Sequence, residues 1–184
     1  MDQVFLSIVI PAYNEEARIS ATLERVISYL GGRSYSWEVL VADDGSTDGT
    51  ASLVSQMAAT QPNLRLISLD HRGKGWAVKN AMLAAQGEYR ILCDADLSVP
   101  IEQVERLLPP LGTEMDIAMG SRAAPGAQRI GEPARRRLMG RIYNALVRII
   151  AISGIQDTQC GFKCYRGEVV PSLFGRLTMD GFAF

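Results

Sequence analysis

The stretch RILCDADLSVP, Arg90 to Pro100, joins a short apolar run to two carboxylates that are separated by a single alanine. The run ends at Cys93, and its length and apolar character predict a buried β-strand. Asp94 and Asp96 follow at the end of this strand. Two carboxylates about 4 Å apart near a protein surface repel each other by roughly 4 kcal/mol. The sequence therefore predicts either a partner that offsets the repulsion or a pair that lies free in water.

Similar apolar runs alternate with helical periodicities along much of the chain. We expect strands at 5–10, 37–42, 64–69, 89–93 and 116–121, and helices at 19–30, 50–59, 78–85 and 104–111. Apolar strands that alternate with amphipathic helices are typical of βαβ units. The predicted fold class is α/β, with a mostly parallel central sheet covered by helices on both faces. A helix at 135–152, a last strand in GFKCYR and a short helix ending near Gly175 complete the single domain that we expect over residues 1–184.

Composition narrows the class of protein. The 184 residues are 47% hydrophobic with a formal net charge of −1, which suits a globular domain and argues against a nucleic-acid partner. A strand pattern begins near the N-terminus without a signal peptide, and no apolar run reaches the roughly 18 residues of a membrane-spanning helix. Three cysteines without a zinc-type spacing predict reduced, buried thiols and a cytoplasmic setting. The only histidine, His71, lies in a polar turn, and we do not expect it to act as a base.

Four polar stretches follow the first four expected strands. They are PAYNEE at 11–16, DDGSTDGT at 43–50, DHRGKG at 70–75 and DADLS at 94–98. The carboxyl ends of parallel strands meet at one edge of a sheet, and ligands of such sheets bind there. We therefore expect one ligand site built from these four loops.

The DADLS loop suits a divalent cation. Asp94 and Asp96 can turn two oxygens toward one point, and the Ser98 hydroxyl can add a third. Mg²⁺ or Mn²⁺ would cancel the repulsion between the carboxylates and keep coordination positions open for phosphate oxygens. The alternative is a solvated loop with a chance Asp-x-Asp repeat.

The PAYNEE loop suits a nucleoside, and it also suits the start of a helix. Pro11 has no N–H to donate and is expected to end the strand ladder. Tyr13 offers a flat ring, while Asn14 and Glu15 offer acceptors for a base or a ribose. In the alternative interpretation Asn14 caps a helix whose first turn holds Glu15 and Glu16.

The next two loops suggest a base acceptor and a phosphate contact. Ser46 or Asp48 can cap the following helix, but capping does not explain why both Asp43 and Asp44 are present. A carboxylate at a strand end can accept the imide N–H of uracil or the N1–H of guanine, and we favour Asp44 for this role. RGKG lacks the spacing of a Walker A motif or of a full dinucleotide fingerprint, which disfavours ATP and nicotinamide ligands. Its glycines still let Lys74 approach a phosphate.

Six motifs in order resemble glycosyltransferase family 2, over nearly the whole chain. They are SIVIPAYNEE, VADDGSTDGT, RGKGWAVKNAM, CDADLS, GSR and DTQCGFK. Within the family they look most like the branch of dolichyl-phosphate β-glucosyltransferases and polyprenyl-phosphate glycosyltransferases. The resemblance implies a single nucleotide-sugar-binding domain of the GT-A type. Relatives usually continue past the final FAF, so we expect a catalytic domain that is truncated at its C-terminus.

The resemblance also implies the site residues. The residues expected around the nucleotide are Pro11, Ala12, Tyr13, Asn14, Glu15, Asp44, Lys74, Asp94 and Ala95. The metal is expected at Asp96 and Ser98, with Asp94 beside it. The expected catalytic residues are Asp94, Asp96 and Arg122, the last of which would meet a phosphate or the sugar. The acceptor side is expected to include Arg129, Asp157, Gln159 and Gly161.

The implied reaction is an inverting sugar transfer. Family members move a sugar from a nucleoside-diphosphate sugar, and Mg²⁺ or Mn²⁺ stabilises the leaving diphosphate. For this branch we expect a hexose, glucose or mannose, to pass from UDP-glucose or GDP-mannose to a polyprenyl or dolichyl phosphate. A strong general base is unnecessary, because the second pKa of such a phosphate is about 6 and the acceptor is already ionised near neutral pH.

A membrane surface is a further expected partner. The arginine-rich stretch from Arg122 leads into the apolar helix expected at 135–152, which suits an anionic membrane surface as well as it suits a core helix with solvated arginines. We therefore expect a protein that associates peripherally with the cytoplasmic face of a membrane. The alternatives are a family 2 transferase onto a saccharide acceptor and a non-catalytic nucleotide-sugar-binding fragment. A sugar nucleotidyltransferase is disfavoured, because PAYNEE is acidic where that class carries a basic, Gly-rich loop.

Overall fold

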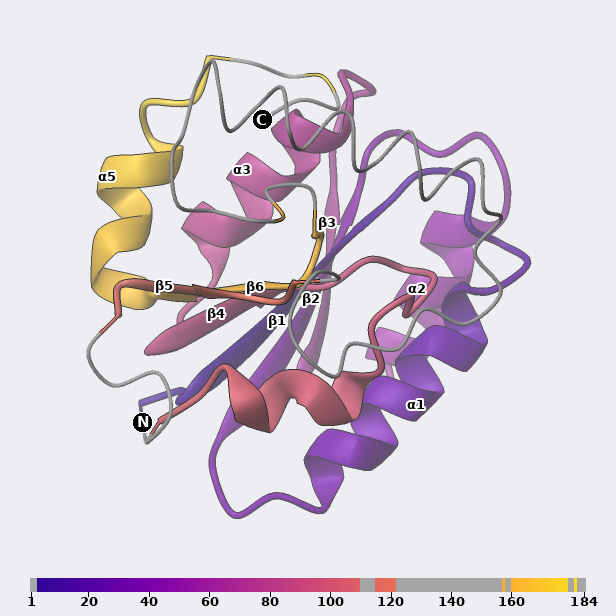
Figure 1. The fold of residues 1–184 in the computed structure, drawn as a ribbon. Helices are drawn as coiled ribbons and strands as arrows, with labels where there is room; N and C mark the ends of the chain where they lie inside the picture. Colours follow the sequence, from indigo (N-terminus) through magenta and orange to yellow (C-terminus); the bar gives the residue numbers. More distant parts are fainter. Residues whose placement is uncertain (1–2, 110–114, 122–156, 158–159, 179–180, 182–184) are drawn as a thin grey trace, which may run out of the picture. The chain divides into compact units, whose positions relative to one another are not determined.

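The computed structural model describes residues 3–109, 115–121, 157, 160–178 and 181 (Figure 1). Contacts divide the chain into two compact units, one of residues 1–118 and 162–184 and one of residues 119–161. The four loops predicted to form the ligand site all belong to the first of these units.

The described strands form one mixed sheet. They are β1 (Leu6–Ala12), β2 (Trp37–Asp43), β3 (Leu64–Ser68), β4 (Tyr89–Leu92), β5 (Ile117–Met119) and β6 (Lys163–Arg166), in the order β3-β2-β1-β4-β6-β5. β1 runs parallel to both β2 and β4, and β2 runs parallel to β3. β6 runs antiparallel to β4. The predicted α/β class with a mostly parallel sheet is confirmed.

The order of the strands reverses at β1. The chain passes from β1 outward to β2 and β3, and then returns to place β4 on the other side of β1. In open α/β sheets the crevice at such a switch point, beyond the carboxyl ends of the strands, binds ligands. The PAYNEE and DADLS loops follow the two strands that meet at this point.

Pro11 does not end β1, contrary to the sequence prediction. The strand continues to Ala12, and Pro11 lies opposite Ala42 of β2 in the ladder. The carbonyl of Val9 accepts a bond from the N–H of Cys93, so Val9 faces β4, and Pro11, two residues on, faces the same side. Pairing of β1 with β4 has ended at Val9 and Leu92. The N–H that Pro11 lacks therefore has no ladder partner to lose.

Helices cover both faces of the sheet (Figure 1). α3 (Lys74–Ala84) and α5 (Val170–Phe174) pack on one face, where Met82 and Phe174 join a buried cluster with Val9 and Leu40 of the strands. On the other face lie α1 (Ile19–Gly31), α2 (Thr50–Ala58) and the 3₁₀ helix η1 (Ile101–Arg106). A second 3₁₀ turn, η2 (Gly167–Val169), precedes α5. The buried residues of α1 recur at helical spacing, as its sequence predicts: Ile19, Leu23, Val26 and Leu30.

One of the predicted helices takes a different form in the structure. The helix expected at 104–111 is instead the 3₁₀ helix η1, which begins after Pro100 and ends before Pro109. Pro109 has no N–H to continue a helical ladder, so the element does not reach the predicted end at 111. The helix expected at 135–152 lies outside the described residues.

None of the helices in the described part of the chain combines the length and the apolarity that crossing a bilayer requires.

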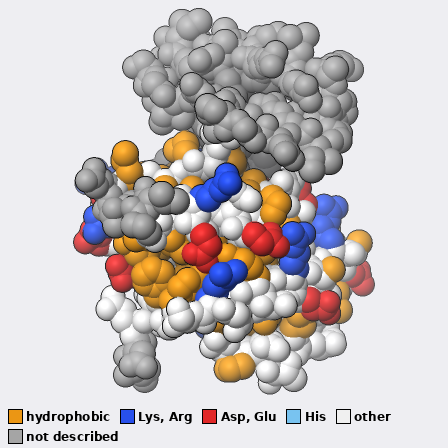
Figure 2. Space-filling model, turned by 60° about the horizontal axis from the view of Figure 1, so that its bottom comes forward, with side chains coloured by type: hydrophobic (Ala, Val, Ile, Leu, Met, Phe, Trp, Pro, Cys, Tyr) orange, Lys and Arg blue, Asp and Glu red, His pale blue; other side chains and the backbone are white. Residues whose placement is uncertain are grey.

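Figure 2 brings the lower side of Figure 1 forward and shows acidic and basic side chains interspersed among apolar ones. Two ion pairs link the α1 region to η1, Arg25 with Glu102 and Arg33 with Glu105.

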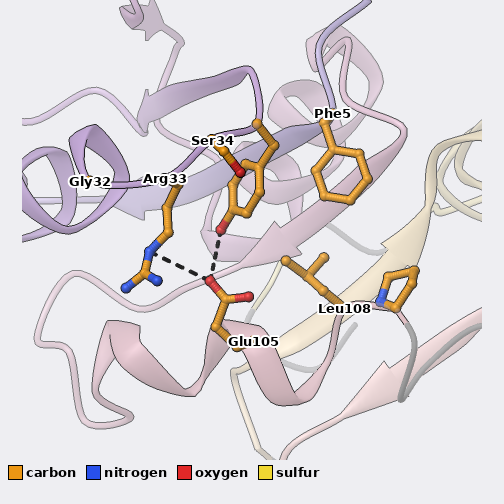
Figure 3. A pocket seen from close by; sticks show the side chains of 8 residues that line it. Phe5, Gly32, Arg33, Ser34, Glu105 and Leu108 are labelled. Atoms are coloured by element: carbon orange, nitrogen blue, oxygen red, sulfur yellow. Dashed lines mark hydrogen bonds and ion pairs between the residues drawn. The ribbon is translucent and has the colours of Figure 1, made fainter.

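A hollow of about 400 Å³ lies near the start of β1, at the end of the strand opposite to the predicted site (Figure 3). Its wall includes Phe5, Tyr35 and Leu108. Glu105 accepts hydrogen bonds of 3.0 Å from the hydroxyls of both Tyr29 and Tyr35. Burial and the bond to Glu105 raise the pKa of Tyr29 to about 12. These contacts tie the loop after α1 to η1, which is a structural role.

Candidate active site

Lys74 supplies the positive charge that the paired carboxylates require. Its ammonium lies 2.6 Å from Oδ1 of Asp94, and both side chains are about two-thirds buried or more. Lys74 is the first residue of α3, and Asp94 is the second residue after β4. The two loops therefore meet at the carboxyl edge of the sheet, as predicted. Sequence reasoning expected Lys74 near a phosphate and did not foresee this ion pair.

Asp96 has a different set of partners. Its carboxylate accepts bonds from the N–H and the hydroxyl of Ser98, at 2.9 and 2.7 Å. Partial burial opposes ionisation, but the bonds from Ser98 and the charges of Arg18 and Lys74 outweigh it, so the pKa of Asp96 is lowered. Asp96 is therefore an exposed, ionised carboxylate at the switch point.

The turn that carries the two carboxylates is anchored to α1 and contains one strained residue. Thr22 of α1 donates a 2.6 Å hydrogen bond to the carbonyl of Ala95, and both residues are buried. Leu97 has a φ of 47°, a left-handed conformation that is uncommon for a residue with a branched side chain. Such strain persists where the surroundings impose it, often at functional sites. Sequence reasoning missed Thr22, although a polar residue beside the apolar stripe of α1 was a signal.

The PAYNEE and DDGSTDGT loops are joined by hydrogen bonds. Asn14, in the left-handed region with a φ of 55°, donates its N–H to Ser46 Oγ and accepts the N–H of Thr47. The N–H of Glu15 donates to the hydroxyl of Thr50 at 2.8 Å. These bonds place the two loops side by side at the edge of the sheet, which confirms their predicted convergence.

The predicted helix cap is wrong in the first loop, and in the second loop it is confirmed for Asp48 and wrong for Ser46. α1 begins at Ile19 after Arg18, so Asn14 is not its cap and Glu15 is not in its first turn. α2 begins at Thr50 after Gly49, and Ser46 does not cap it, because the Ser46 hydroxyl bonds to the N–H of Asn14. Asp48 does accept the N–H and the hydroxyl of Thr50, and the hydroxyl bond is the main reason that its pKa is lowered. The left-handed turn at Asn14 delays the start of α1.

Asp44 is buried and carries several hydrogen bonds. It is 2% exposed, and its two oxygens accept the N–H groups of Arg72 and Gly73 at 3.0 and 2.8 Å. His71 Nδ1 lies 2.8 Å from Asp44 Oδ2. Gly45, with a φ of 68°, lies so close that a Cβ there would stand 2.7 Å from the backbone nitrogen of His71. Asp44 therefore binds the loop after β3 to the end of β2.

Tyr13 and His71 form a stacked pair at this edge. Their ring centroids are 4.1 Å apart and their planes are inclined by 19°. Sequence reasoning considered His71 only as a base and missed its contact with Tyr13. Its place in the third of the four converging loops was the available signal.

Asp43 is the other unusual carboxylate. It is 3% exposed, and its Oδ2 accepts the N–H of Ser46 at 3.3 Å. Within the described residues its Oδ1 has no hydrogen-bond partner.

The remaining predicted residues fall into three groups. Arg122, Arg129 and Gln159 lie outside the described residues. Asp157, which is buried, and Gly161 belong to the second unit. Pro11, Ala12 and Ala95 lie at the carboxyl ends of β1 and β4, as expected. The role of Arg129, Asp157, Gln159 and Gly161 on the acceptor side stays a prediction, as does that of Pro11, Ala12 and Ala95 at the nucleotide.

No cluster of three or more metal-binding side chains occurs in the part of the chain that the structure describes. Magnesium and manganese nevertheless bind through one or two carboxylates together with substrate phosphates. Asp96 and Ser98 offer a carboxylate and a hydroxyl, and Asp94 offers a second carboxylate that Lys74 now neutralises. This oxygen donor set fits such an ion.

Comparison with known proteins identifies relatives along most of the chain. The sequence profile of glycosyl transferase family 2 matches residues 7–174. A dolichyl-phosphate beta-glucosyltransferase of Trichomonas vaginalis is 36% identical, over 94% of this chain and 55% of its own. The dolichyl-phosphate beta-glucosyltransferase of Homo sapiens is 34% identical, over 97% of this chain and 60% of its own. The chain thus spans little more than half of the length of these relatives.

Solved structures share the fold. A mannosyltransferase from Pyrobaculum calidifontis, in complex with GDP-Man and Mn²⁺, superposes with a TM-score of 0.59 at 22% identity, over 93% of this chain and 47% of its own. A glucosyl-3-phosphoglycerate synthase from Mycobacterium tuberculosis, in complex with Mn²⁺, UDP and glucosyl-3-phosphoglycerate, gives a TM-score of 0.60 at 23% identity, over 91% of this chain and 58% of its own. The architecture is the GT-A type.

Proposed function

The chain belongs to glycosyl transferase family 2, and we propose that it moves a hexose from a nucleoside-diphosphate sugar to a polyprenyl or dolichyl phosphate, with inversion at the anomeric carbon. Among the hexoses we favour glucose, because relatives along most of the chain are named dolichyl-phosphate beta-glucosyltransferases.

One observation carries the proposal. Lys74 and the two carboxylates Asp94 and Asp96 lie together at the switch point between β1 and β4. A diphosphate in this crevice would bring its own negative charges beside an ammonium and a metal-binding carboxylate. Binding of the donor is then a matter of electrostatic positioning.

Asp96 is the residue that would hold Mg²⁺ or Mn²⁺, with Ser98 beside it and Asp94 as a second donor. Its exposure and its lowered pKa keep it ionised and open to the crevice. The ion would stabilise the negative charge that develops on the leaving nucleoside diphosphate. Lys74 would neutralise the part of that charge that lies toward α3.

The nucleoside would lie over the loops after β1 and β2. Tyr13 is 43% exposed and presents an aromatic ring, and Asp44 presents a carboxylate at the end of β2. Pro11, Ala12, Asn14 and Glu15 form the adjoining backbone of the site, and Asn14 and Glu15 are held in place by their bonds to the second loop.

The acceptor would be a lipid phosphate that is already ionised, so the reaction needs no strong general base. We expect the acceptor side to involve Arg122, Arg129, Asp157, Gln159 and Gly161. A membrane surface at the cytoplasmic face would present the lipid to this side.

Calorimetry with UDP and GDP, each with and without Mn²⁺, tests the donor site. Metal-enhanced binding of one nucleotide supports the proposal and identifies the base. If neither nucleotide binds under any condition, the catalytic proposal is wrong and a non-catalytic role replaces it.

Transfer from labelled UDP-glucose to a short polyprenyl phosphate, with free glucose as the control acceptor, tests the acceptor. Label in the lipid fraction alone supports a lipid phosphate acceptor. Label in a free disaccharide alone contradicts it.

A further inference from the structure

The imidazole of His71 makes two contacts that a nucleobase would make. The first is a stack, because the ring lies 4.1 Å from the ring of Tyr13 with an inclination of only 19°. The second is at Asp44, where Nδ1 lies 2.8 Å from the carboxylate Oδ2 and is hydrogen-bonded to the main-chain carbonyl at 2.9 Å.

The proton on this hydrogen bond can be assigned from its surroundings. His71 Nδ1 lies 2.8 Å from the carboxylate oxygen of Asp44 and 2.9 Å from the main-chain carbonyl of the same residue. Both neighbours accept and neither donates. Nδ1 therefore carries a hydrogen, which it donates to the main-chain carbonyl of Asp44. The ring thereby lies against the carboxylate that would accept the imide N–H of uracil or the N1–H of guanine.

We propose that His71 occupies the nucleobase position of the free protein, and that its ring must leave before a nucleotide binds. The inference rests on the proposed function, because it takes Tyr13 and Asp44 as the groups that receive the base. His71 then lowers the affinity for a nucleotide, because its ring competes with the base for the position over Tyr13 and beside Asp44.

The structure lets the ring leave without dismantling the loop. The side chain of His71 is 53% exposed, so it can rotate toward solvent. The backbone of the loop stays attached to Asp44 through the N–H groups of Arg72 and Gly73. The exchange also conserves the interactions, since an incoming base replaces one stack with another and one N–H donor with another.

Displacement nevertheless has a cost, because the nucleotide must first break contacts that already exist. A stacked pair of aromatic rings contributes an amount that corresponds to a few-fold to tenfold change in affinity. Removal of the ring should therefore strengthen nucleotide binding, which is the opposite of what removal of a supporting contact does.

The binding test compares wild type with His71→Ala and His71→Phe, by calorimetry with UDP and GDP in the presence of Mn²⁺. We expect His71→Ala to bind the preferred nucleotide about three- to tenfold more tightly. His71→Phe still covers Tyr13 and should gain less. Unchanged or weaker binding by His71→Ala overturns the proposal, because the ring would then be a bystander or a platform for the base.

A spectroscopic test follows the ring itself in the unmodified protein. His71 is the only histidine, so a tag-free chain has one set of imidazole signals in its NMR spectrum. Stacking on Tyr13 should shift these signals upfield in the free protein, and the preferred nucleotide should return them toward values of an exposed histidine. Signals that keep their stacked position at saturating nucleotide overturn the proposal.

Failure of the proposed function has a separate signature. If neither wild type nor His71→Ala binds UDP or GDP, the nucleotide site itself is refuted, and the inference falls with it. If wild type binds a nucleotide and His71→Ala binds no better, only the inference is refuted.

Discussion

The hydroxyl of Thr22 donates a 2.6 Å hydrogen bond to the carbonyl of Ala95, so helix α1 holds the turn that separates the two carboxylates of the candidate site. The bond is buried, and Thr22 and Ala95 are 5% and 4% exposed. A contact inside the core therefore determines where Asp94 and Asp96 point.

Thr22→Val should destabilise the protein by about 1–2 kcal/mol, because it keeps the shape of the side chain and leaves the buried carbonyl of Ala95 without a donor. Chemical denaturation measures the loss. Thr60→Val is the matched control, since the Thr60 hydroxyl bonds to the carbonyl of Met57 at an exposed position. Nucleotide affinity should fall in Thr22→Val alone. An equal effect of both substitutions would show that α1 does not hold the turn.

Lys74→Met should weaken binding of a nucleoside diphosphate about tenfold, because it removes the ammonium beside Asp94 and leaves the carboxylates facing the diphosphate without compensation. The free energy of unfolding should fall by only about 1 kcal/mol, since the ion pair is partly exposed. Calorimetry and denaturation measure the two quantities. Lys79→Met is the control on the same helix, because Lys79 bonds to the carbonyl of Leu177. Equal losses of affinity in both variants would contradict a specific role for Lys74.

Asp96→Asn should remove the enhancement of nucleotide binding by Mn²⁺, since an amide is a poor ligand for a hard cation. In wild type the enhancement should persist from neutral pH down to about pH 5, because the pKa of Asp96 lies below the ordinary value of an aspartate. It should be lost only as the pH falls through that lowered pKa. Titrations at several pH values measure this. Metal enhancement that survives in Asp96→Asn would place the ion elsewhere.

Cys93 and Cys164 should react slowly with a thiol reagent in the native protein at pH 8. Burial raises the pKa of each thiol to about 12, and the charges of Asp94 and Asp96 add to the effect at Cys93. A raised pKa keeps the thiol protonated and unreactive. The free energy of unfolding should also fall as the pH rises above about 9, because the unfolded chain then loses these protons first. Rapid native reaction of either thiol, against the unfolded chain as reference, would contradict this assignment.

Local sequence patterns predicted the strands correctly. They failed for helix type and helix caps, which depend on contacts with other parts of the chain. The apolar runs at 37–42 and 64–69 match the bounds of β2 and β3 to within one or two residues. A short apolar run between turn residues is typical of a buried strand. The apolar spacing at 104–111 resembled a helix, but the structure has the 3₁₀ helix η1 at Ile101–Arg106, and Pro109 prevents a helix from reaching 111. The caps at Asn14 and Ser46 were wrong because these two side chains bond to the adjacent loop, whereas Asp48 does accept the N–H of the first residue of α2.

The sequence by itself determined the parallel sheet, the edge where the polar loops converge and the residue types that suit a nucleotide sugar. It did so because strand and helix periods are local, and because parallel strands bring their carboxyl ends to one edge. Only the tertiary structure decided which atoms meet there. Lys74 and Asp94 are 20 residues apart, His71 and Asp44 are 27 apart, and Thr22 and Ala95 are 73 apart. Such pairs depend on the order of the strands and on the packing of helices against them, and no spacing along the chain specifies either.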